Sequence, residues 1–261
     1  MSKTALLREL HRGPKILVLP NAWDVSSARI FEATGFPAIA TTSAGVANSL
    51  GYPDVERISR DEMLEVVRRI VKAVSVPVTA DVEAGYGDAV KTAQALADLG
   101  ACGMNLEDTT GEASLVDIPT QVKIIQAIRS KTEVVINART DVFMFSIGDP
   151  ATILERTIER IHAYRNAGAD CVFVPGVRDA QTIAKLTEAA KCPINILATA
   201  GTPPIAELER LGVARVSIGS GAMRASMGLT QRIAQELFER GTYSSFTDGA
   251  MPYPDANRLF K

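Results

Sequence analysis

Acidic side chains follow short apolar runs in this chain, at points where a buried strand would end. Asp81 and Glu83 come directly after the run VPVT, and Glu107 closes a later run, GMNLE. Residues i and i+2 of a strand share a face, so we expect Asp81 and Glu83 to point the same way. Like charges held that close must share a proton or a cation. Because carboxylate oxygens are the ligands of hard divalent ions, the three acids predict a Mg²⁺ site, with Mn²⁺ as the alternative ion.

Other polar residues at the ends of neighbouring runs belong to the same candidate site. Thr42 and Ser43 follow one run, Asp54 ends the segment GYPD, and Arg139 follows the run VVINA. The guanidinium of Arg139 has the fork geometry that binds a substrate carboxylate or phosphonate. An ion pair between Arg139 and a nearby acid is the structural alternative. Asp88 differs from the other acids, because it opens the helical segment DAVKTAQALADLG and suits an N-cap.

Eight apolar, β-branched runs recur along the chain, each followed by a helical stretch. They are mostly continuous rather than alternating, which indicates strands buried on both faces, as in a parallel sheet. The runs lie at 16–20, 38–42, 76–83, 103–108, 133–140, 171–176, 194–198 and 215–221. Eight such units in about 220 residues predict a (β/α)₈ TIM-type barrel. The alternative, an open doubly wound sheet, would have a GxGxxG motif after the first run, and this chain has none there.

The helical stretches carry capping signals that separate them from the strands. Before the segment 60–74, Ser59 and Glu62 form a capping-box pattern that precedes an apolar stripe. Glycine ends several helices shortly before the next strand, as Gly168 does. We expect one domain, in which residues 1–222 form the barrel and residues 223–261 form a helical extension that packs on a partner subunit.

Composition and charge exclude several classes of protein. The net charge is −2 and no run of five like charges occurs, which argues against a nucleic-acid binder and against a membrane-surface binder. The N-terminus lacks the apolar segment of a signal peptide, and no apolar run reaches the ~18 residues of a membrane span. Three cysteines without CxxC spacing favour a reduced, cytoplasmic protein.

The two histidines lie away from the candidate site. His11 is in the N-terminal helical segment and His162 is within a long helix. Neither a Ser-His-Asp triad nor a His-rich zinc site is therefore expected. The segment SIGSG at 217–221 resembles a phosphate-binding turn, although a plain tight turn explains it equally well.

Four motifs, taken together in their order and spacing, resemble the isocitrate lyase/phosphoenolpyruvate mutase superfamily. They are TTSAGVANSLGYPD, TADVEAGYGD, GMNLED and INARTD, and the similarity runs from about residue 14 to about residue 225. The resemblance implies a (β/α)₈ barrel that binds Mg²⁺ and a small 2-oxo acid or its enolate. It also implies a homotetramer in which the eighth helix is swapped between neighbouring subunits.

The same resemblance implies roles for individual residues at the metal. By their positions in the motifs, Asp81, Glu83 and Glu107 are the metal-site carboxylates. Glu83 stands where many members have the shorter aspartate. Asp54 matches the acid that holds metal-bound water.

The resemblance further implies a set of substrate-binding residues. Thr42, Ser43 and Ala44 match the segment that holds the substrate carboxylate through backbone N–H and hydroxyl groups. Arg139 matches the arginine that stabilises the enolate or binds the substrate.

The loop after the fourth run departs from the lyases and the mutase of the superfamily. Isocitrate and methylisocitrate lyases have a Lys-Arg/Lys-Cys-Gly-His loop there, and phosphoenolpyruvate mutase has Lys and Asn, whereas residues 108–121 read DTTGEASLVDIPTQ. Gly176 stands where the lyases have a glutamate after the sixth strand. Glu112 and Ser114 are the candidates for moving protons within this loop.

The site residues and the resemblance together predict a Mg²⁺-dependent lyase that cleaves a C–C bond of a small 2-oxo acid or 2-hydroxy diacid. Retro-aldol cleavage and decarboxylation both fit. Decarboxylation best tolerates the missing cysteine, because it needs no general base at the bond that breaks. One alternative is a phosphonopyruvate hydrolase or mutase acting on a P–C bond. The other is a barrel that binds a 2-oxo acid without turning it over.

Overall fold

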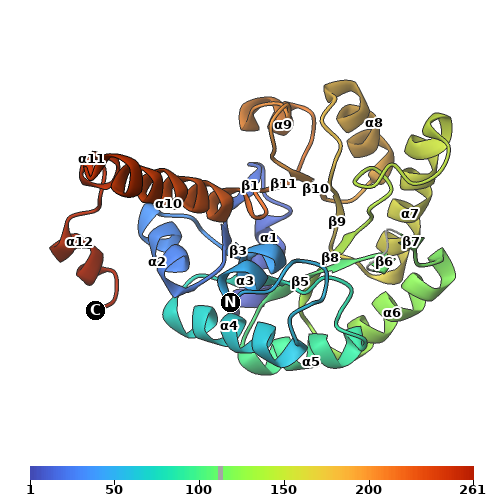
Figure 1. Ribbon diagram of the computed structural model, residues 1–261. Helices are drawn as coiled ribbons and strands as arrows, with labels where there is room; N and C mark the ends of the chain where they lie inside the picture. The colour runs from blue at the N-terminus through green and yellow to red at the C-terminus, as the bar shows by residue number, and fades with distance from the viewer. Residues whose placement is uncertain (111–113) are drawn as a thin grey trace.

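A parallel sheet that curves into a barrel forms the centre of the computed structural model, which describes residues 1–110 and 114–261 (Figure 1). All eight predicted strands are present, and one further short strand, β2, joins them in this sheet. The strands are β1 (Leu17–Leu19), β2 (Asn21–Ala22), β3 (Ile39–Thr41), β4 (Val78–Asp81), β5 (Gly103–Glu107), β8 (Val135–Arg139), β9 (Cys171–Val174), β10 (Ile194–Leu197) and β11 (Arg215–Ser217).

Pro20 explains why nine strands make an eightfold barrel. It separates β1 from β2, so that β1 pairs with β11 while β2 pairs with β3. Proline has no N–H to donate to a ladder, which interrupts the first barrel strand at this point. The sheet therefore begins at β1 and ends at β2, and these two short strands are consecutive parts of one barrel strand. The predicted TIM-type barrel is therefore confirmed, and the open doubly wound sheet is excluded.

Helices cover the outside of the barrel and begin and end at the predicted signals. Ser59 and Glu62 form the capping box of α4, Asp88 caps α5 by accepting from Lys91 N, and Gly168 ends α7 in the left-handed conformation. The helices are α1 (Lys3–Leu10), α2 (Val25–Thr34), α3 (Ser43–Ser49), α4 (Arg60–Ala73), α5 (Ala89–Leu99), α6 (Ile118–Lys131), the 3₁₀ turn η1 (Pro150–Thr152), α7 (Ile153–Ala167), α8 (Ala180–Ala190) and α9 (Ile205–Arg210).

Apolar side chains between the helices and the strands form the main core. Leu96 of α5, Ile125 of α6 and Leu186 of α8 are fully buried there together with strand residues such as Met104. Burial of each such side chain contributes roughly 1.5–3 kcal/mol. This layer holds the strands rigidly, so that the residues at their carboxyl ends have defined positions.

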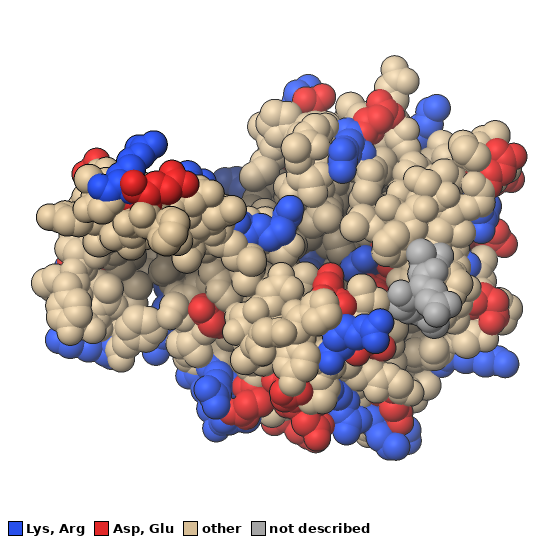
Figure 2. All heavy atoms as spheres, viewed as in Figure 1, with Lys and Arg blue, Asp and Glu red and all other residues tan. Residues whose placement is uncertain are grey.

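The C-terminal segment leaves the barrel as an arm. It consists of α10 (Gly221–Arg240), α11 (Ser244–Thr247) and α12 (Tyr253–Arg258), and Figure 1 shows it extending away from the barrel wall. Past Met223, which is buried, α10 exposes Met227, Leu237 and Phe238. Much of the arm surface in Figure 2 carries neither acids nor bases. The predicted packing of this extension on a partner subunit stays a prediction.

Two short strands follow β5 in the described part of the chain. They are β6 (Thr109–Thr110) and β7 (Ser114–Leu115), which pair antiparallel. Glu112, the predicted proton carrier, lies outside the described residues. None of the helices in the described ranges is both long and apolar enough to cross a membrane.

Candidate active site

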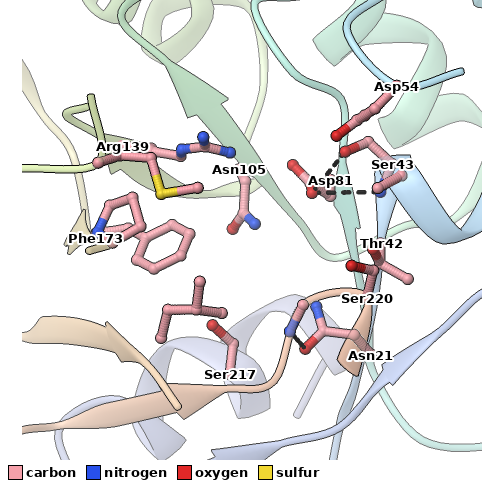
Figure 3. Close-up of a pocket in the computed structure, with 15 residues that line it drawn as sticks. Asn21, Thr42, Ser43, Asp54, Asp81, Asn105, Arg139, Phe173, Ser217 and Ser220 are labelled. Atoms are coloured by element: carbon pink, nitrogen blue, oxygen red, sulfur yellow. Dashed lines mark hydrogen bonds between the residues drawn. The ribbon is translucent and has the colours of Figure 1, made fainter. Parts of the chain in front are cut away.

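A cavity of about 120 Å³ opens at the carboxyl ends of the barrel strands. Its lining combines a polar side, which includes Thr42, Ser43, Ala44, Asp54, Asp81 and Arg139, with an apolar side, and Figure 3 shows most of these side chains facing the same space. The strand-end position matches the place where barrel enzymes hold their substrates. The fold therefore brings these six predicted residues together, whereas Glu83 and Glu107 lie just outside the lining.

Asp81 is the last residue of β4 and faces the cavity with one oxygen unused. Its Oδ2 accepts hydrogen bonds from the hydroxyl and the backbone N–H of Ser43, at 3.0 and 3.3 Å (Figure 3). Its Oδ1 is buried and has no hydrogen-bond partner among the described residues. A buried oxygen without a partner costs about 1–3 kcal/mol. Asp81 is thus held in place by Ser43 while Oδ1 remains available to a ligand.

Glu83 does not lie on the strand, so the expectation that strand alternation would aim it with Asp81 is wrong. β4 ends at Asp81, and Glu83 has a φ of +51°, in the left-handed region. Its carboxylate accepts from Glu56 N at 2.6 Å and from the Tyr86 hydroxyl at 2.9 Å. Glu56 in turn accepts from Tyr86 N at 2.7 Å. These three bonds fasten the loop that carries Asp54 to the turn after β4.

The proton on Glu83 makes a testable contribution to stability. Burial, with the nearby charge of Asp81, raises the pKa of Glu83 to about 7. The folded protein therefore binds a proton more tightly than the unfolded chain, and stability from this group is lost as pH rises from about 4.5 to about 7. We expect a loss of up to roughly 3 kcal/mol in EDTA, measured as the free energy of unfolding in urea at each pH.

A Glu83→Gln variant is the matched control for this pH dependence. Its amide accepts from Glu56 N and donates to the Tyr86 oxygen, so both bonds persist without a titrating group. The variant should show a flatter profile between pH 4.5 and 7. Equal slopes for the two proteins would contradict the assignment.

Glu107, Arg139 and Asp141 form one charged cluster beside the cavity. Glu107 and Arg139 are register partners on β5 and β8, and Arg139 Nη1 lies 2.8 Å from Glu107 Oε2. Arg139 Nε donates to Asp141 Oδ1 at 2.7 Å. Burial raises the pKa of Glu107 to about 8, although the charge of Arg139 opposes this shift. The ion-pair interpretation of Arg139 is therefore correct, although the same side chain also lines the cavity.

Thr42 and Gly45 shape the other polar wall. Thr42 is the N-cap of α3 and accepts from Gly45 N at 3.3 Å, which begins the helix at Ser43 and Ala44. A Cβ at Gly45 would lie 2.5 Å from Thr42 Cγ2, so only glycine fits there. The substrate-binding roles of Thr42, Ser43 and Ala44 stay predictions, with the Ser43 amide already bonded to Asp81.

The donor set fits a divalent ion held partly through water. In the ranges 1–110 and 114–261, no three acidic, histidine or cysteine side chains lie close enough to hold one ion directly. Mg²⁺ often takes only one or two carboxylates and keeps several waters. The unpartnered Oδ1 of Asp81 suits direct binding. Asp54, Glu83 and Glu107 are further carboxyl groups around it, and burial raises the pKa of each, so a bound cation would have to favour their ionised forms. The metal roles of these acids stay predictions.

The apolar side of the cavity and its floor were not anticipated from the sequence. Met144, Phe173, Pro175 and Leu197 form the apolar side. Asn21 and Asn105 are polar residues of the lining, and Asn21 Oδ1 accepts from the amides of Ile218 and Gly219. Those bonds engage two amides of the SIGSG turn, which supports a tight turn rather than a phosphate site. One sequence feature could have indicated Asn105 as a lining residue: it is an asparagine inside an apolar strand, GMNLE.

Comparison with known proteins identifies the family. A family model described as phosphoenolpyruvate phosphomutase matches residues 7–238. An uncharacterized protein of Mycobacterium tuberculosis (strain H37Rv) is 39% identical over 213 residues, which cover 81% of each chain. The chain belongs to the phosphoenolpyruvate phosphomutase family. The resemblance to the isocitrate lyase/phosphoenolpyruvate mutase superfamily is thereby confirmed.

Relatives of this phosphoenolpyruvate phosphomutase family member include lyases. Oxaloacetate decarboxylase 2 of Pseudomonas putida is 34% identical over 84% of this chain and 75% of its own. The structure of oxaloacetate acetylhydrolase in complex with its product oxalate has a TM-score of 0.86 and 25% identity, covering 99% of this chain and 93% of that one. Enzymes that act on small molecules, among them C–C lyases, are thus its relatives.

Proposed function

We propose that this protein is a Mg²⁺-dependent lyase that cleaves a C–C bond of a small 2-oxo acid or 2-hydroxy diacid and releases an enolate. The observation that carries the proposal is the buried, unpartnered Oδ1 of Asp81 in a site rich in acids. Arg139, the cation in the lining, is already shared by Glu107 and Asp141. A 2-oxo acid therefore needs a further positive charge to bind beside Asp54 and Asp81, and a divalent ion supplies it.

The chain's own residues orient the substrate and offset the charge that develops on it. Asp81 and the surrounding acids would hold the ion, which when bound supplies Lewis acidity to the carbonyl. Arg139 lies across the cavity from Thr42 and Ser43 and offsets negative charge as the enolate forms (Figure 3). The cavity is small, about 120 Å³, which suits a substrate of only a few non-hydrogen atoms.

The apolar side of the cavity favours C–C cleavage over P–C cleavage. Phe173 and Leu197 themselves carry no donor or positive charge, and the Arg139 guanidinium that lies 5.8 Å from the centre of the Phe173 ring is already shared by Glu107 and Asp141. A phosphonate dianion at this wall would keep its full charge. A carboxylate there loses its charge on becoming CO₂, so an apolar wall assists decarboxylation. The match to phosphoenolpyruvate phosphomutase keeps a P–C activity as the second candidate.

Turnover of a substrate panel separates the candidate functions. The panel contains oxaloacetate, 2,3-dimethylmalate, 2-methylisocitrate and phosphonopyruvate, each with Mg²⁺, with Mn²⁺ and with EDTA. We expect pyruvate from a C–C substrate, and loss of the activity in EDTA. Inorganic phosphate from phosphonopyruvate would favour the second candidate. Mg²⁺-dependent binding of oxalate without any turnover would favour a binding protein.

We also propose a homotetramer in which the arm packs on a neighbouring copy of the chain. Phe238 is 93% exposed on α10, and Leu237 and Met227 are about half exposed. Apolar side chains in such number on one projecting element are typical of an interface. A second copy is the occupant that the family resemblance favours.

A Phe238→Asp variant tests this assembly. The charge would enter an apolar interface, so we expect the protein to shift from a tetramer towards dimers or the 27.9 kDa monomer. Light scattering after size-exclusion chromatography measures the mass. Glu239→Gln, at the neighbouring exposed position, is the control and should leave the mass unchanged. A monomeric unmodified protein would refute the proposed assembly.

A further inference from the structure

An arginine lies beneath the floor of the cavity without an acidic partner. Arg215 of β11 is fully buried, and its guanidinium forms no ion pair within residues 1–110 and 114–261. Its Nε has no hydrogen-bond partner there either. Ser217, two residues on, lines the cavity. Because alternate residues of a strand share a face, Arg215 lies one layer deeper in the barrel, below Ser217.

The contacts of Arg215 lead to the cavity through Asn105. Arg215 Nη2 donates to Asn105 Oδ1 at 3.2 Å, and Asn137 Nδ2 donates to the same oxygen at 2.7 Å. Two donors on one oxygen fix the orientation of the amide. Asn105 Nδ2 is therefore turned the other way, and no described residue accepts from it. Since Asn105 lines the cavity, its N–H groups are available to an anion there.

The other side of Arg215 offers no negative charge. Arg215 Nη1 lies 3.4 Å from His11 Nε2, while His11 Nδ1 donates to Leu7 O at 2.7 Å. With its proton on Nδ1, His11 is neutral and accepts at Nε2. A guanidinium buried without a carboxylate costs several kcal/mol, and an apolar residue of similar volume would remove that cost. Buried groups that lower the stability of a protein in this way often belong to functional sites.

We propose that Arg215 is a positioning residue of this site, which holds Asn105 Nδ2 towards the cavity and places an uncompensated positive charge under the bound anion. The identity of that anion, a 2-oxo acid, rests on the proposed function. Arg139 forms ion pairs with two acids, whereas Arg215 forms none with the described residues, and the charge of Asp81 acts on it only from a distance. Arg215 therefore supplies positive potential to the cavity floor without touching the ligand.

Oxalate binding and thermal stability, measured together, test the role of Arg215. The Arg215→Met variant removes charge and donor, Arg215→Gln keeps a donor, and Arg215→Lys keeps the charge. Calorimetric titration with oxalate, in Mg²⁺ and in EDTA, should show roughly ten- to hundredfold weaker binding for the Met variant. The loss of oxalate affinity should be smaller for the Gln variant and smallest for the Lys variant. The Tm of the Met variant should be unchanged or higher, which a merely structural role does not predict.

Arg129→Met is the matched control. Arg129 pairs with Asp170, which precedes β9 at the opposite end of the barrel. That variant should lose Tm and keep its oxalate affinity. Oxalate binding within about twofold of the unmodified protein in Arg215→Met, or in Arg215→Gln if the Met variant does not fold, would overturn the inference. Oxalate binding by the unmodified protein without turnover of any panel substrate would overturn the proposed function alone. No oxalate binding by the unmodified protein would overturn both.

Discussion

An Asp81→Ala variant is expected to lose about a thousandfold or more of its Mg²⁺-dependent turnover while keeping its fold. Oδ1 of Asp81 is buried without a partner, so the ion would lose the oxygen that the structure leaves available to it. Stability should change little, because the variant also removes the cost of that unsatisfied oxygen. Steady-state kinetics, Mg²⁺ titration calorimetry and Tm measure the three quantities.

Asp88→Ala is the control for Asp81→Ala. Asp88 is an acid close in sequence, but it caps α5 and forms an ion pair with Lys91 at the surface. Its removal should cost about 1 kcal/mol of stability and leave kcat unchanged. Full Mg²⁺-dependent activity in Asp81→Ala would rule out the metal assignment.

An Arg139→Met variant is expected to lose both activity and stability. The substitution leaves Glu107 and Asp141 without their shared cation, and Asp141 is fully buried. Breaking a buried pair from one side costs about 3–5 kcal/mol. Turnover should fall about a hundredfold or more, because the positive charge that faces the substrate is removed. Urea unfolding and kcat/KM measure the two losses.

A triple variant separates the two roles of Arg139. Adding Glu107→Gln and Asp141→Asn to Arg139→Met removes the unpaired charges and should restore most of the stability. Activity should remain low, since the cation is still absent; Glu107→Gln alone measures how much of that loss comes from neutralising a predicted metal-site acid. Arg139→Lys keeps a charge but not the fork that reaches both acids, and should retain only part of each property. Recovery of activity in the triple variant would mean that Arg139 has a structural role alone.

Short-range patterns predicted the elements of this protein well. The eight strands, the capping box at Ser59 and the N-cap at Asp88 appear where the sequence indicates them. Each depends on residues within one helical turn or one strand, so the neighbouring sequence contains the necessary information. The strand-end rule then placed Asp54, Asp81 and Arg139 on one cavity.

Contacts between residues far apart in the sequence were harder to predict. Glu83 was placed on a strand, but the chain turns after Asp81 and fastens Glu83 to Glu56 and Tyr86. Glu56 lies 27 residues away from Glu83, and no local sequence pattern predicts a hydrogen bond between residues so far apart in the chain. The partners of Arg139 likewise depended on the register of β5 against β8.

The sequence by itself determined the barrel, the family and the acids and arginine gathered at the strand ends, because periodicity, caps and motif spacing are local properties. Only the tertiary structure decided which polar and charged side chains have hydrogen-bond or ion-pair partners and which have none. Ser43 donates to one oxygen of Asp81 and leaves the other without a partner. Arg139 pairs with two acids, while Arg215 pairs with no acid in the part of the chain that the structure describes. The physical reason is that hydrogen bonding and ion pairing in a buried site depend on distances between strands, which sequence separation does not contain.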